Sequence, residues 1–246
     1  MYNIRVIVIL GLVPRVFNAN PLLINSKYVY SNPIHLGDFT MRKPQSINAL
    51  TTLGRVQLSP SFFMRDMLYS EISNFQGIRN IPHFPDLAIE AGSKLCTELL
   101  EPLQEKFGKI SVRSAYRSPE VNDFGNKNNL GCASNESNYA GHIWDYRDKD
   151  GCLGATATIV VNRFISYYER TKDWPAMAWY IHDNLPYASL YFFPKLGAFN
   201  ISWHEKPERR IDSYVAPKGC LTKPGMDNHE GDHSVYYAQM LDGVLG

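Results

Sequence analysis

The stretch from Pro85 to Tyr116 constrains the fold more than any other part of this sequence. Between residues 85 and 107, apolar side chains recur at four-residue intervals, namely Leu87, Ala91, Leu95, Leu99 and Leu103. That spacing places them on one stripe and predicts an amphipathic helix that covers a core and ends at Gly108. Residues 110–116 then alternate apolar and polar side chains, which is typical of a half-buried strand.

The remaining elements follow in an order that fixes the fold class. We predict helices over 59–75, 162–184 (broken at Trp174-Pro175) and 235–241, a long loop over 122–140, and strands over 141–146, 189–193 and 199–203. Helices come first, and strands with one helix between them come later. This order predicts an α+β fold, an antiparallel sheet with flanking helices, and not alternating βαβ units.

Charge and hydropathy exclude several classes of partner. The net charge of +1 gives no basic footprint for a nucleic acid, so no nucleic-acid partner is expected. The apolar run from Val6 to Leu10 is too short to cross a bilayer, so no stable membrane span is expected. If this run belongs to a signal peptide, the protein is periplasmic or extracellular; otherwise it is cytoplasmic.

The cysteines leave two interpretations open. None of the four forms a CxxC pair, which disfavours a structural zinc knuckle. Cys132 and Cys152 flank a polar segment and either form a disulfide or stay as thiols.

A nine-residue motif closes the predicted strand. Residues 114–122, S-A-Y-R-S-P-E-V-N, resemble the S-G-Y-R-S-P-x-x-N signature of the zinc D-Ala-D-Ala carboxypeptidases and related phage endolysins. The preceding helix, which ends at Phe107-Gly108, is also similar to that family. The resemblance implies a hedgehog-like (DD-peptidase-like) domain over 57–217. An arm over 1–56, loosely packed or signal-like, precedes it, and a tail over 218–246 packs on it.

Two later segments resemble the other family motifs in part. Residues 131–145 align without a gap to G-G-A-x-N-S-x-H-x-x-G-x-A-x-D, with matches at Gly131, Ala133, Asn135, Gly141 and Asp145. Asn138 stands where the family has its first metal-binding His. Trp203-His204 is similar to the third motif, but Ile201 stands where the family has its catalytic carboxylate.

The resemblance implies a zinc site and a substrate pocket. Its metal ligands would be Asp145 and His204, with Asn138 at the third position and His142 as a candidate replacement. Arg117 would bind a substrate carbonyl or carboxylate, and Ser114, Tyr116 and Trp203 would line the pocket. Glu205 is a candidate ligand or base, although strand alternation points it to the opposite face.

The departures from the family pattern leave two functions open. A catalytic zinc takes three protein ligands and a water, and a carboxylate removes the proton of that water. Asn138 is a poor zinc ligand and Ile201 cannot accept a proton. The chain is therefore either a weakened or altered metallopeptidase acting on peptidoglycan peptides, or a non-catalytic relative that binds a peptide or cell-wall material.

One further motif imitates a zinc protease. His229-Glu230-Gly231-Asp232-His233 matches H-E-x-x-H, which needs a stable helix to bring both histidines to one face. Gly231-Asp232 and the nearby Pro224-Gly225 disfavour such a helix. The segment is expected to be a solvated loop, or else to donate a replacement ligand to Asp145 and His204.

Overall fold

The computed structural model describes residues 40–246, which form one compact unit. Its strands are β1 (Ile110–Ser114), β2 (Gly154–Val161), β3 (Ser189–Phe192), β4 (Phe199–His204), β5 (Arg210–Ser213) and β6 (Gly219–Thr222). Its helices are α1 (Ile47–Gly54), α2 (Met64–Met67), α3 (Glu71–Gln76), α4 (Pro85–Leu95), the π-helical turn η1 (Cys96–Leu100), α5 (Glu101–Phe107), α6 (Pro119–Lys127), α7 (Asn135–Asn138), α8 (Phe164–Thr171), α9 (Trp174–Asn184) and α10 (Ser234–Leu245).

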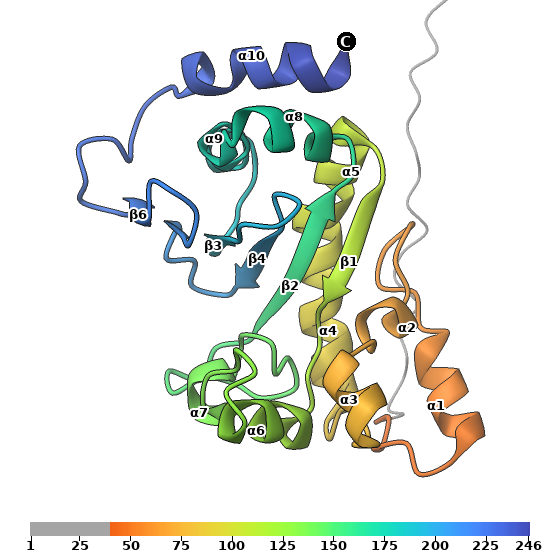
Figure 1. The fold of residues 1–246 in the computed structure, drawn as a ribbon. Coiled ribbons are helices and arrows are strands. Elements are labelled where there is room, and N and C mark those ends of the chain that lie inside the picture. The colour runs from red at the N-terminus through yellow and green to blue at the C-terminus, as the bar shows by residue number, and fades with distance from the viewer. Residues whose placement is uncertain (1–39) are drawn as a thin grey trace, which may run out of the picture. The chain divides into compact units, whose positions relative to one another are not determined.

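The strands form one six-stranded sheet in the order β1-β2-β4-β3-β5-β6 (Figure 1). Neighbouring strands are antiparallel except β3 and β5, which are parallel. The α+β class is therefore confirmed, but the predicted all-antiparallel sheet is wrong, because the sheet is mixed. A parallel neighbour requires a crossover, and here β4 and the loop after it supply the crossover.

One face of the sheet carries the core. Strand alternation sends Ala155, Ala157 and Ile159 of β2 and Phe199 and Ile201 of β4 to this face, and all are fully buried. The helices α4, α5, α8, α9 and α10 contribute the opposing apolar side chains. The helices thus cover one face and leave the polar side chains of the same strands on the other.

The predicted helix over 85–107 is confirmed as a continuous run of α4, η1 and α5 (Figure 1). Pro85 occupies its first turn and Gly108 follows its last residue with a positive φ of 77°. The stripe residues Ala91, Leu95, Leu99 and Leu103 have no exposed surface. The predicted strands at 110–116, 189–193 and 199–203 correspond to β1, β3 and β4, and the broken helix over 162–184 corresponds to α8 and α9.

Several other predictions are wrong. Residues 141–146 form tight turns and not a strand, and the second strand is β2. The turn forms because the N–H groups of Gly141 and Ile143 both donate to the carbonyl of Asn138. The predicted loop over 122–140 contains most of α6 and all of α7, capped by Ser118 and Ser134, and the single helix over 59–75 is divided into α2 and α3.

The two ends of the described unit both contribute to packing. Within the predicted arm, α1 buries Leu53 completely in the core, and α10 at the other end buries Met240. The run Val6–Leu10 lies outside the described residues. Within residues 40–246, no helix is long and apolar enough to cross a membrane.

Candidate functional site

The first two family-like motifs lie against each other. The N–H of Arg117 donates to the carbonyl of His142 at 2.8 Å, and His142 Nδ1 donates to the carbonyl of Ala115 at 2.8 Å. The hydroxyl of Tyr116 donates to Asp145 Oδ1 at 3.0 Å. These bonds join the end of β1 to residues 142–145, so the motifs that resemble the family form one structural unit.

Asp145 serves this unit as a buried acceptor. It has no exposed surface, and its Oδ2 accepts from the N–H groups of His83 at 2.7 Å and Phe84 at 3.2 Å. Burial raises the pKa of Asp145 above its ordinary value, against the lowering effect of these bonds. The carboxylate therefore binds both the backbone of the segment before α4 and the side chain of Tyr116.

Asn138 is also committed to internal contacts. Its Nδ2 donates to Asn122 Oδ1 at 2.6 Å, and its Oδ1 accepts from the N–H of His142 at 3.2 Å. Asn122 in turn donates to the carbonyl of Ala133 and to Asn135 Oδ1. The asparagine at the family's first ligand position thus ties α6 to α7.

His142 carries the one buried side-chain nitrogen or oxygen that lacks a hydrogen-bond partner in the described part of the chain, its Nε2. Because Nδ1 faces a carbonyl, Nδ1 holds the proton and Nε2 presents a bare lone pair. Burial, and secondly the nearby Arg117 guanidinium, lower the pKa of His142 to about 3. The imidazole is therefore neutral at physiological pH.

His204 lies elsewhere, in a cleft of about 470 Å³. Its Nε2 lies 3.1 Å from Asp148 Oδ2, and its Nδ1 lies within 3.0 Å of both the N–H and the carbonyl of Lys206. The imidazole can thus satisfy Nδ1 as an acceptor when neutral and as a donor when protonated. The N–H of Cys152, and then that of Asp150, lower the pKa of Asp148, so the partner of His204 is an anion.

The cleft is lined by polar groups of both charges. The hydroxyls of Thr156 and Ser202 lie 2.8 Å apart on the polar face of β2 and β4, next to His204. The other side chains that give the lining its polarity are those of Ser137, Tyr139, Asp148, Lys149, Asp150, Ser189, Lys206 and Glu208. A site with donors, acceptors and both signs of charge suits a polar ligand that itself carries both, such as a small peptide.

Gly154 allows this cleft wall to close. A Cβ at this position would lie 2.2 Å from the carbonyl oxygen of Ala140 and 2.7 Å from His204 Cδ2. Only a glycine at the start of β2 lets the turn at residue 140 approach the strand beside His204.

Trp203 is among the residues that line this cleft, but its indole is bonded on the other side of the sheet, and Glu205, Arg117 and Ser114 do not line the cleft. The Trp203 indole donates to Glu98 at 2.8 Å, on the helix side of the sheet, and Glu205 accepts from the N–H of Leu153 at 2.7 Å. Arg117 Nη1 donates to Cys132 Sγ at 3.3 Å. Ser114 lines a separate cavity of about 390 Å³.

The donor set does not fit the zinc site that the resemblance implies. Asp145 is occupied by three internal donors, and His204 pairs with Asp148. Within residues 40–246, no group of three or more His, Cys, Asp or Glu side chains is placed to hold a metal ion. Ile201, at the place of the catalytic carboxylate, faces the core with no exposed surface. All four cysteines are free thiols, including Cys132 and Cys152.

The H-E-x-x-H segment forms part of a buried cluster instead of a solvated loop. His229 and His233 pack against His182 of α9, with ring centroids 4.9 and 5.1 Å from it. His233 Nδ1 donates to Asp183 at 2.7 Å, and His182 Nε2 donates to the carbonyl of His229 at 2.7 Å. These bonds fasten the segment before α10 to α9, so its histidines have a structural role.

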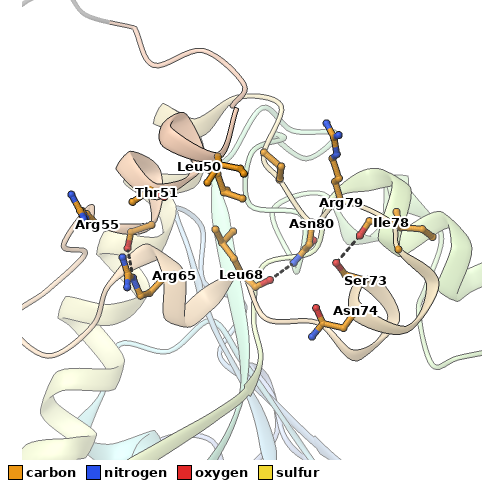
Figure 2. A pocket seen from close by; sticks show the side chains of 14 residues that line it. Leu50, Thr51, Arg55, Arg65, Leu68, Ser73, Asn74, Ile78, Arg79 and Asn80 are labelled. Carbon is orange, nitrogen blue, oxygen red and sulfur yellow. Dashed lines mark hydrogen bonds between the residues drawn. The ribbon is translucent and has the colours of Figure 1, made fainter. Parts of the chain in front are cut away.

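A larger hollow of about 830 Å³ lies between α1 and the segment from α3 to Ile81 (Figure 2). None of the sequence-predicted site residues lines it. The hydrogen bonds drawn in Figure 2 join Arg65, Ser73 and Asn80 to backbone carbonyls, so these polar groups hold loops in place. The cleft at His204 is the better candidate because it combines ionisable groups with a paired imidazole.

Sequence reasoning found His204 but missed its surroundings. Thr156 and Ser202 could have been found from the alternation of polar and apolar residues along 154–159 and 199–204, which sends Thr156, Ser202 and His204 to one face. Asp148 lies between the segment 141–146 and β2, outside any regular element, and carries no such signal.

Comparison with protein-family models, with curated proteins and with solved structures finds no match for this chain.

Proposed function

We propose that this chain is a D-Ala-D-Ala carboxypeptidase-like domain that binds a small peptide in the cleft at His204 and does not hydrolyse it. The observation that carries the proposal is the position of Asp145. The family's ligand position is filled by a carboxylate, but three internal donors hold it in the fold. A side chain used in this way stabilises the motif and is not available to a metal.

The cleft supplies groups for both ends of a peptide. Lys206, which forms no ion pair within residues 40–246, can bind a terminal carboxylate through a charge-assisted hydrogen bond next to the His204–Asp148 pair. Glu208 offers a carboxylate for an amine, and the hydroxyls of Ser189, Ser202 and Thr156 can bond to amide groups. Hydrolysis would need an activated water and a proton acceptor, which the buried Ile201 cannot provide.

Zinc binding tests the structural role of Asp145. We expect equilibrium dialysis against micromolar zinc to give the same zinc content for the wild-type chain and for Asp145→Asn. The asparagine keeps an oxygen for the two N–H donors, so this variant is expected to stay folded, as circular dichroism will check. One zinc per wild-type chain that is lost in folded Asp145→Asn would contradict the proposal, because it would make Asp145 a ligand.

A further inference from the structure

The polar face of the sheet extends well beyond the cleft. Directly paired residues of neighbouring strands share a face, and one such row runs through Thr158, Asn200, Tyr191 and Asp212. Thr158 Oγ1 donates to Asn200 Oδ1 at 2.6 Å, which leaves the two Nδ2 protons of Asn200 for another acceptor. Arg210 holds Asp212 through two bonds of 2.5 and 2.9 Å. The row thus presents oriented amide and carboxylate groups.

Aromatic rings border this row. Tyr191 lies 4.6 Å from Tyr214 and 5.8 Å from Phe193, measured between ring centroids, and Phe193 lies 6.0 Å from Tyr214. Tyr214 is 57% exposed, and its contacts with the other two rings make it part of a contiguous aromatic patch. The three rings form an aromatic cluster that includes Tyr191 of the polar row. We call Tyr191, Phe193 and Tyr214 the aromatic platform.

The cavity of about 390 Å³ adjoins both features. Phe193 of the aromatic platform and Thr158 of the polar row line it, so the cavity continues the same surface. Pro194 and Ala198 add apolar walls. The polar groups of its lining are those of Glu71, Arg113, Ser114, Thr158 and Lys195. None of the charged side chains of this cavity is ion-paired within residues 40–246.

We propose that this surface binds an oligosaccharide, with one pyranose ring in the cavity against Phe193 and the next ring against Tyr214, the most exposed ring of the aromatic platform. A pyranose has an apolar C–H face and a rim of hydroxyl groups, each of which donates and accepts. It therefore needs a ring to stack on and neighbouring groups of both hydrogen-bonding kinds, which the aromatic platform and the polar row supply together.

The cavity lining carries charges of both signs, Glu71 against Arg113 and Lys195. The hydroxyl groups of a sugar suit such a lining, because each can donate to the carboxylate or accept from a cation. A nucleotide is the competing ligand, since Arg113 and Lys195 would attract its phosphate while Glu71 would oppose it, so the test includes adenosine monophosphate. The sugar site is separate from the peptide site proposed for the cleft, since the cleft and the cavity share no lining residue.

The test is a titration of the full chain with cellotriose and with chitotriose, followed by isothermal calorimetry. We expect at least one trisaccharide to bind, and Phe193→Ala and Tyr214→Ala to weaken it about tenfold, as for the truncation of a central aromatic contact. Two matched controls are Tyr236→Ala on α10 and Phe75→Ala on α3, whose side chains are 60% and 88% exposed elsewhere on the chain. Both should bind within about twofold of the wild type.

Three outcomes would overturn the proposal. The first is the absence of heat from either trisaccharide at 10 mM, which is about the weakest affinity that would count as a site. The second is an equal loss of trisaccharide affinity in the control variants, and the third is binding of adenosine monophosphate as strong as that of the sugars. Ser114→Ala separates this site from the cleft, because it removes a hydroxyl from the cavity and leaves the cleft unchanged. Ser114→Ala should therefore weaken the binding of the sugar and leave the affinity for the peptide unchanged.

Discussion

Replacing Asp145 by alanine is expected to lower the free energy of unfolding by about 3–5 kcal/mol, because it leaves buried donors without an acceptor. The donors are the N–H groups of His83 and Phe84 and the hydroxyl of Tyr116. Asp145→Asn keeps an oxygen for the two N–H groups and removes a charge that burial disfavours, so it should cost less than about 2 kcal/mol. Urea unfolding of the three proteins measures both differences.

The contrast between the two variants identifies the role of the side chain. A loss below 1 kcal/mol in Asp145→Ala (about the net value of one hydrogen bond) would show that the three bonds do not stabilise the fold. Equal and large losses in both variants would show that the charge itself is required, as expected for a side chain that faces a cation.

Acid is expected to destabilise the protein through His142. Its folded-state pKa of about 3 lies below its ordinary value of 6.5, so the unfolded chain binds the proton more readily. Stability is therefore complete above pH 6.5 and falls as the pH decreases from 6.5 towards 3. The full difference between these two pKa values corresponds to a loss of roughly 5 kcal/mol in the free energy of unfolding at the acid end of this window, an upper bound for a single buried group.

The variant His142→Asn isolates this effect. Asparagine retains a side-chain N–H for the carbonyl of Ala115 but does not titrate. We expect the free energy of unfolding of the variant, measured by urea at pH 7, 6, 5 and 4, to fall less steeply than that of the wild type. Parallel pH profiles would mean that His142 is hydrated or already protonated in the folded protein.

The elements with strong local signals could be predicted from the sequence. The helix over 85–107 has a regular apolar stripe and a closing glycine, and β3 and β4 alternate large apolar residues with polar residues or tyrosine. The strand β2 was missed because alanine contributes little apolar contrast to its A-T-A-T pattern. The strands β5 and β6 are four residues long and contain charged or glycine residues, so neither has a local signal.

The candidate site was less predictable because its geometry depends on distant parts of the chain. Asp145 is fixed by the backbone of His83 and Phe84, which lie 62 and 61 residues earlier. His204 is fixed by Asp148, 56 residues earlier. No local pattern specifies such contacts, so the motif resemblance could predict which residues matter but not that they separate into a structural carboxylate and a cleft histidine.

The most direct test of binding without hydrolysis is a calorimetric titration of the protein with a D-Ala-D-Ala-ended peptide in buffer that contains zinc. We predict a saturable one-site isotherm, weakened about tenfold in Lys206→Ala by the loss of a charge-assisted bond, and unchanged in Ser114→Ala. Sustained heat after each injection, accompanied by free D-alanine, would show turnover and contradict the absence of hydrolysis. The absence of any saturable heat would contradict peptide binding.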